Sequence, residues 1–230
     1  MANTILPDIH MVMAFCFRGG VTYTEDNVMH ALPAASLSGI RQQARLLQYG
    51  KGTTTLLVKF TEVGAAAFLQ DSPVALFNHT VALEHVISKH DALFLCERLA
   101  GAHNDAQRIA LTEAMLISRL DYRKADLLVY DAMDAIKRAT GNIRIKELAA
   151  GLYISQDPFE KRFRQATGTT PKHFAEIIRL RSLIRDIDTF KNLGTAAHAF
   201  GFFDQAHFIR SFRAFTGQPP KAFFRNARYW

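Results

Sequence analysis

The feature that most constrains the fold is an internal repeat in the C-terminal half of the chain. A shift of 49 residues pairs Phe159 with Phe208, Phe163-Arg164 with Phe212-Arg213, Thr167-Gly168 with Thr216-Gly217, Pro171-Lys172 with Pro220-Lys221, and Phe174 with Phe223. Chance agreement at so many Gly, Pro and Phe positions is improbable. We therefore interpret the two segments as copies of one unit, and two copies make a duplication rather than a solenoid.

The first copy predicts two short helices joined by a tight turn. The first helix covers Ile145 to Gly151, and Ser155 is suited to cap the second. Pro158 then falls at the third helical position, where a missing N–H costs little. The second helix ends at Gly168, a common C-terminal stop. Its apolar residues follow helical spacing and predict a buried stripe of Phe159, Phe163 and Ala166.

The second copy repeats this pattern. A helix from about Leu193 to Phe200 precedes Gly201, which turns the chain, and Asp204 is suited to cap the next helix. That helix ends before Gly217. Its predicted buried stripe is Phe208, Phe212 and Phe215. The repeat therefore predicts a helix-turn-helix, twice.

A longer helix is predicted between the two copies. Thr170 is a cap and Pro171 occupies the first helical position, and the apolar spacing continues to about Asp188. Such a helix is about 25 Å long at 1.5 Å per residue. It would separate two recognition helices by a distance compatible with the ~34 Å repeat of the major groove.

Opposite the buried stripes lie the side chains expected to contact DNA. A recognition helix reads base edges mainly with its N-terminal residues. An arginine suits guanine, a glutamine suits adenine and a carboxylate suits cytosine. A lone residue of this kind is ordinary on an amphipathic helix, but the duplication favours DNA contact for Lys161, Gln205 and Arg210. The predicted base-reading residues are Asp157, Glu160, Lys161, Gln205, Ala206, Ile209 and Arg210, and the predicted phosphate contacts are Arg164 and Arg213.

Charge divides the chain near Asp121 to Lys124. Residues 1–122 carry 9 Lys and Arg against 11 Asp and Glu, whereas residues 123–230 carry 19 against 10. A basic half indicates a polyanionic partner, either nucleic acid or an anionic membrane. The buried stripes use the phenylalanines that a membrane would need, so we expect double-stranded DNA and no membrane. The predicted domains are 1–122 and 123–230.

Residues 143–226 resemble the DNA-binding half of the AraC/XylS family of bacterial transcription regulators. The second copy carries most of the pattern, and one departure is Tyr153, where the family often has glycine. The resemblance implies sequence-specific transcription regulation, with effector binding, oligomerisation or both assigned to the N-terminal half. The matching residues are Leu148-Ala149, Ser155, Phe159, Arg162-Phe163-Arg164, Gly168, Thr170-Pro171, Ala196 to Asp204, Phe208 to Arg213, and Gly217 to Pro220.

The N-terminal half predicts a small sheet followed by two helices. The expected strands are Met11 to Phe17, Val21–Thr24, Val28–Leu32 and Thr53 to Phe60. The expected helices run from Ala92 to Gly101 and from the cap Asn104 to about Leu120, the second with Ile109, Ala110, Met115, Leu116 and Leu120 on its inner side. The predicted fold is thus an α+β module followed by an all-α DNA-binding domain of two helix-turn-helix units joined by a long helix.

The stretch from Leu56 to Leu69 resembles the sensor-like region of a subgroup of these regulators. A small-molecule effector and a second copy of the chain are therefore the remaining partners that the resemblance implies. The residues that would bind an effector are not predicted.

No catalytic constellation emerges from the sequence. Four histidines with Glu84 match no metal-ligand spacing, and no Gly-rich phosphate loop is present. Two cysteines make no disulfide framework, and no secretory signal precedes the first strand, so we expect a cytoplasmic protein. We predict no enzyme activity, no metal and no cofactor; the alternative is an enzyme whose N-terminal catalytic half is localised to DNA by the basic half. The histidines are His79, His85, His90 and His103.

Overall fold

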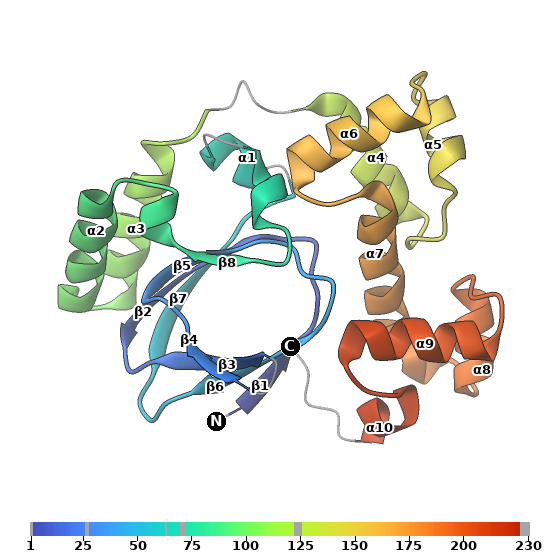
Figure 1. Cartoon of the computed structure of the whole chain (residues 1–230), viewed down its shortest axis with the longest axis horizontal. Helices are drawn as coiled ribbons and strands as arrows, with labels where there is room; N and C mark the ends of the chain where they lie inside the picture. The colour runs from blue at the N-terminus through green and yellow to red at the C-terminus, as the bar shows by residue number, and fades with distance from the viewer. Residues whose placement is uncertain (1, 26–27, 63, 70–71, 122–125, 226–230) are drawn as a thin grey trace.

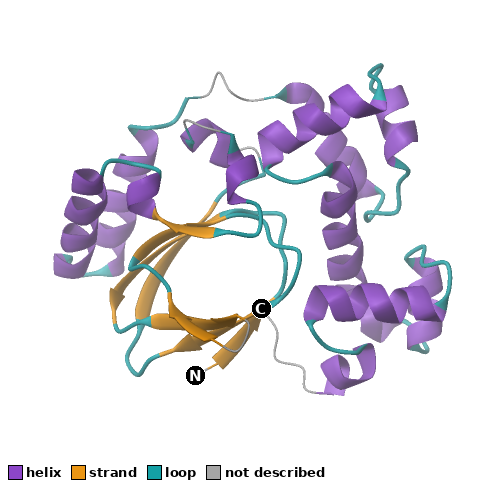
Figure 2. Ribbon diagram, viewed as in Figure 1, coloured by secondary structure: helices purple, strands orange, loops and turns teal. Residues whose placement is uncertain are grey.

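All the strands of the described residues lie in the first part of the chain, with α1 and η1 before the last of them, and the rest of the chain is helical (Figure 2). The computed structural model describes residues 2–25, 28–62, 64–69, 72–121 and 126–225. The predicted domain boundary between residues 122 and 123 lies outside the described residues, as does Val63 within the stretch from Leu56 to Leu69. Among the described residues, no helix combines the length and hydropathy needed to cross a bilayer.

The β-rich part contains two four-stranded sheets, ordered β1-β6-β3-β4 and β7-β2-β5-β8, which face one another (Figure 1). Every neighbouring pair is antiparallel. The expected small sheet was wrong in extent, because β1, β5, β6 and β8 were not predicted. The strands are β1 Ala2–Ile5, β2 Val12–Arg18, β3 Val21–Glu25, β4 Val28–Ala31, β5 Ala35–Ser38, β6 Arg45–Tyr49, β7 Thr54–Lys59 and β8 Thr80–Ala82.

Two helices, α2 (Lys89–Gly101) and α3 (Asp105–Ile117), pack together, and α2 covers β2. Ser88 and Asn104 cap them by accepting backbone N–H groups, so α2 begins earlier than predicted. The predicted inner face of α3 was partly wrong, since Ile109 and Ala110 are exposed. The short elements here are α1 (Gly64–Phe68), η1 (Pro73–Leu76) and η2 (Leu83–His85).

The helical part is organised around phenylalanines. Phe159, Phe163 and Phe174 make successive edge-to-face contacts, and Phe208, Phe212 and Phe223 do the same in the second copy. Such pairs add about 0.5–1.5 kcal/mol each beyond the burial of their area. The elements are α4 Leu127–Arg138, α5 Ile145–Gly151, α6 Gln156–Thr167, α7 Pro171–Asp186, η4 Ile187–Thr189, α8 Leu193–Ala199, α9 Gln205–Thr216 and α10 Pro220–Arg225.

The β-rich part contacts the first helix-turn-helix unit through η1 and α1. The Ser72 hydroxyl donates to the Gln165 carbonyl at 3.3 Å. A Cβ on Gly168 would lie 2.9 Å from the Pro73 carbonyl oxygen, so the end of α6 lies directly against η1. Glu62 also pairs with Lys137 of α4. Burial alone would raise the pKa of Glu62, but the hydrogen bond and charge of Lys137 hold it below its ordinary value.

Candidate nucleic-acid interface

The first helix-turn-helix unit consists of α5, a turn and α6. Ser155 stands at the N-cap as predicted, but its side chain makes no capping hydrogen bond. Tyr153 in the turn has φ +56°, a left-handed conformation that glycine adopts at lower cost. Phe159 and Phe163 are fully buried, whereas Ala166 is only half-buried and Thr167 is buried instead.

The second unit consists of α8, a turn and α9. Asn192 and Thr195 form a capping box at the start of α8. The Asp204 carboxylate accepts the His207 N–H at 2.6 Å, which confirms the predicted cap of α9. Gly201 has φ +74°, and a Cβ there would meet the Asn142 side chain at 2.4 Å, so glycine is required.

The two units have the same order of elements, but their turns differ in length. α6 and α9 are related by 49 residues, whereas α5 and α8 are related by 48, because the second turn has one more residue. The second helices of the two units, α6 and α9, end in the same way. The hydroxyls of Thr167 and Thr216 each donate to the carbonyl four residues earlier and accept the N–H two residues later. Gly168 and Gly217 then follow with φ near +80°.

α7 connects the two units. Thr170 caps it by accepting the His173 N–H at 3.1 Å, and Pro171 is its first residue, both as predicted. The helix ends at Asp186, two residues before the predicted end, and continues as the single turn η4. α6 and α9 lie at opposite ends of α7 (Figure 1).

The outer faces of α6 and α9 carry the residues predicted to contact DNA. Neither Lys161 nor Arg210 faces the protein interior, and Arg164 and Arg213 are exposed as well. Glu160 is half-buried, and its carboxylate accepts a hydrogen bond from the Gln156 amide at 2.8 Å. The other predicted base-reading residues are exposed: Asp157, Gln205, Ala206 and Ile209.

The cationic side chains of α6 differ in whether they form an ion pair with a neighbouring carboxylate. Arg162 forms an ion pair with Asp126 at the start of α4. The hydrogen bond with Asp126 raises the pKa of Arg162. Lys161 and Arg164 have no ion pair among the described residues, and with Asp157 they line one shallow hollow on the outer face of α6. These two cations are therefore available to an external anion.

The helix-turn-helix arrangement of these helices agrees with a comparison to known protein families. Residues 148–226 match a family model described as a helix-turn-helix domain, over about a third of the chain. This region is a helix-turn-helix domain. The match is of the AraC type and confirms the predicted resemblance. A domain of this type supports the interpretation of the chain as a DNA-binding transcription regulator.

Solved structures with a similar arrangement include ToxT from Vibrio cholerae bound to an unsaturated fatty acid, at 13% identity, covering 96% of this chain and 88% of that chain with a TM-score of 0.47. A further ToxT structure from Vibrio cholerae matches at 14% identity, 96% of each chain and a TM-score of 0.48. The C-terminal domain of AraT, a response regulator from Geobacillus stearothermophilus, matches at 18% identity, 46% of this chain, 88% of that chain and a TM-score of 0.41. No curated protein matches significantly.

A cavity of about 210 Å³ lies between the two sheets. Its walls are largely apolar, with Leu47 and Leu57 among them, and Arg41 and Arg45 stand at one side, where a polar hollow adjoins it. Burial lowers the pKa of Arg45, and the nearby charge of Arg41 lowers it further. The Arg45 Nε is buried without a hydrogen-bond partner among the described residues. Nothing in the sequence pattern indicated this site, because its walls come from distant segments.

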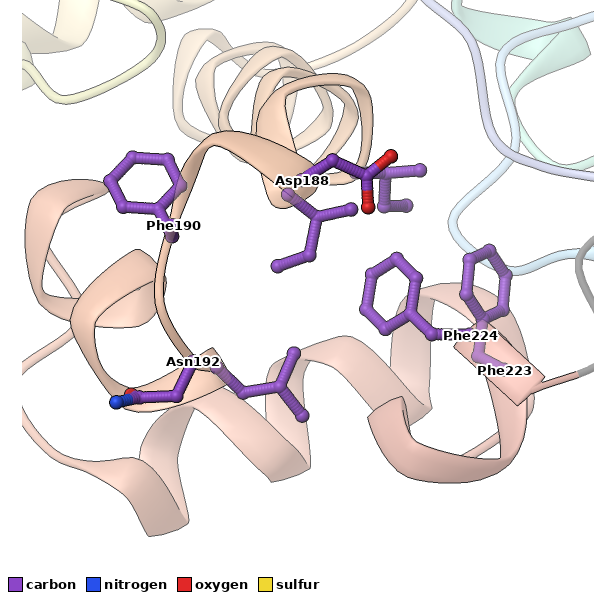
Figure 3. Close-up of a pocket in the computed structure, with 8 residues that line it drawn as sticks. Asp188, Phe190, Asn192, Phe223 and Phe224 are labelled. Carbon is purple, nitrogen blue, oxygen red and sulfur yellow. The ribbon is translucent and has the colours of Figure 1, made fainter.

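A further hollow, of about 390 Å³, lies between the end of α7 and α10 (Figure 3). Phe190, Phe223 and Phe224 line it with Asp188 and Asn192. None of the predicted DNA contacts lines this hollow, so we assign it no part in base reading. Within the described residues, no three His, Cys, Asp or Glu side chains are grouped to hold a metal ion.

Proposed function

We propose that this chain regulates transcription by inserting α6 and α9 into adjacent major-groove segments of duplex DNA. The observation that carries the proposal is the pair of equivalent recognition helices, with exposed Lys161 and Arg210, at the two ends of α7. α7 spans about 24 Å, and a helix with its side chains adds about 10 Å, a sum close to the ~34 Å groove repeat.

The side chains divide by chemistry into base contacts and phosphate contacts. Lys161 and Arg210 suit guanine, Gln205 suits adenine, and the carboxylates of Asp157 and Glu160 suit cytosine. The exposed apolar side chains of α9, Ala206 and Ile209, suit the thymine methyl group. Further along each helix, Arg164 and Arg213 would neutralise phosphate and supply salt-dependent affinity.

The cavity between the sheets is the proposed effector site of an N-terminal module, residues 1–122. Two guanidinium groups beside an apolar cavity favour an anion with an apolar body, such as a small carboxylate. Only Glu25 offsets Arg41, at 3.7 Å, among the described residues, and the Arg45 Nε has no partner there. Arg41 donates to the Asn78 carbonyl and Arg45 to the Thr80 hydroxyl, so each keeps further N–H groups that a carboxylate could accept.

The same cavity wall contacts the DNA-binding helices. The Arg41 carbonyl lies 3.3 Å from the His173 Nε2 of α7, and the Ala44 N–H donates to the Phe215 carbonyl of α9 at 3.0 Å. Arg181 of α7 donates to the carbonyl of Pro7, which also lines the cavity. A ligand that moves these segments would therefore act directly on α7 and α9, which is a physical route for regulation.

Selection of bound sites from random duplex DNA tests the proposal. We expect two specified segments about one helical turn apart, and a palindrome would indicate a homodimer. Recovery of no preferred sequence, or of one short segment only, would contradict two inserted helices.

For the effector site, we expect calorimetry to show that octanoate binds and octanol does not. The Arg45→Gln substitution is expected to abolish octanoate binding. Equal binding of octanoate and octanol would contradict the assigned role of the two arginines.

A further inference from the structure

Two aromatic side chains project into solvent at the turns of the two helix-turn-helix units. Tyr153 is 99% exposed and Phe203 is 92% exposed, more than any other large hydrophobic residue among those described. Neither side chain has a recorded hydrogen bond or ring contact within the described part of the chain. Scattered exposed apolar residues are ordinary on a protein surface, but one such aromatic residue in the turn of each copy of a duplicated unit is not.

Both residues stand directly before a recognition helix. Tyr153 precedes the N-cap Ser155 by two residues, and Phe203 precedes the N-cap Asp204 by one. The 49-residue repeat does not align them, because it pairs Tyr153 with Phe202, which is buried. An exposed aromatic residue is therefore present in each turn even though the turns differ in length.

The fold itself does not require Tyr153. Its backbone is left-handed, with φ +56°, and Gly201 occupies the corresponding position of the second turn, directly after the C-cap of α8. Glycine would adopt this conformation at lower cost, and the tyrosine ring buries no surface in return. A residue that strains the fold and contributes no packing is typical of a functional position.

We propose that Tyr153 and Phe203 are DNA-contacting residues, one in each unit, whose rings pack against deoxyribose and thymine methyl groups at the edge of the major groove. The inference rests on the proposed function. The N-terminal end of a recognition helix is the end that approaches the bases, and these rings flank that end. Phenylalanine contacts thymine methyl groups, and a tyrosine hydroxyl can also donate to phosphate.

The test measures folding and DNA binding in the full chain. Tyr153→Gly is expected to keep or raise the melting temperature, because it relieves the left-handed strain, while weakening binding to the selected site by roughly five- to thirtyfold. Phe203→Ala is expected to leave the melting temperature unchanged and to weaken binding by a similar factor. The salt dependence should stay the same for Phe203→Ala, since a ring releases no counterions.

Ile117→Ala is the matched control, because Ile117 is 68% exposed but lies on α3 of the β-rich part. It should change neither property. Wild-type affinity in both folded variants would overturn the inference. Wild-type affinity combined with reduced transcription would also overturn it, since the rings would then contact another protein. If the wild-type chain itself bound no selected DNA, the proposed function would fail rather than this inference.

Discussion

Arg210→Ala offers the sharpest measurement of base reading. Arg210 is exposed on α9, and among the described residues its side chain makes no ion pair or hydrogen bond. Among the described residues, truncation therefore removes no hydrogen bond or ion pair, and the free energy of unfolding should change by no more than about 0.5 kcal/mol. A good bidentate contact to guanine discriminates by about 1–3 kcal/mol, which corresponds to roughly a 5- to 150-fold increase in Kd.

The assay is fluorescence anisotropy on the selected site and on each of its single-base-pair variants, at several salt concentrations. Arg210→Ala should lose affinity for the preferred site and lose discrimination at one base pair. Arg213→Ala is the matched variant: it should weaken binding to all sequences alike and lower the salt slope by about 0.9. Equal loss at every base pair for Arg210→Ala, or a lowered melting temperature, would refute the assigned role.

Two further predictions concern the contacts between the β-rich part and the helices. Gly168→Ala should destabilise the protein by roughly 2–5 kcal/mol in urea unfolding, because left-handed strain adds to a clash with the Pro73 carbonyl. Gly217 has φ +76°, but a Cβ there would meet no atom of the described residues within 4 Å, so Gly217→Ala should lower the free energy of unfolding by only about 1–2 kcal/mol. Equal losses for the two substitutions would contradict the contact between η1 and α6. The pKa of Glu62 is lowered in the folded state, so its pairing with Lys137 stabilises the protein above the unfolded pKa of about 4.3 and is lost as the pH falls through the folded pKa. Urea unfolding between about pH 6 and 3 should therefore show a shallower acid loss for Glu62→Gln than for the wild type, and parallel slopes would contradict the pairing.

The helix-turn-helix units were largely predictable because their signals are local. The cap at Asp204, the left-handed Gly168 and Gly217, and the buried phenylalanines follow from neighbouring residues and a period of 3.6. The duplication strengthened each signal, since the same pattern appears twice. The base-reading assignments remain predictions, because exposure alone does not identify a DNA contact.

Hydrophobic periodicity did not predict correctly which face of α3 is buried. Arg108 turns inward, where its guanidinium donates to the carbonyls of Leu99 and Ala102 and lies over the Phe17 ring. That rotation exposes Ile109. The guanidinium also pairs with Asp105, three residues earlier. Because an arginine is expected at the surface, hydrophobic spacing alone gave no sign that Arg108 would face inward.

The sequence by itself therefore determined the two helix-turn-helix units and the helix between them, because caps, turns and helical spacing act over a few residues. Only the tertiary structure decided the pairing of β1, β5, β6 and β8, the cavity beside Arg41 and Arg45, and the contacts of that wall with α7 and α9. Each of these joins segments far apart in the chain, and no local pattern encodes which distant strand or helix a residue will meet.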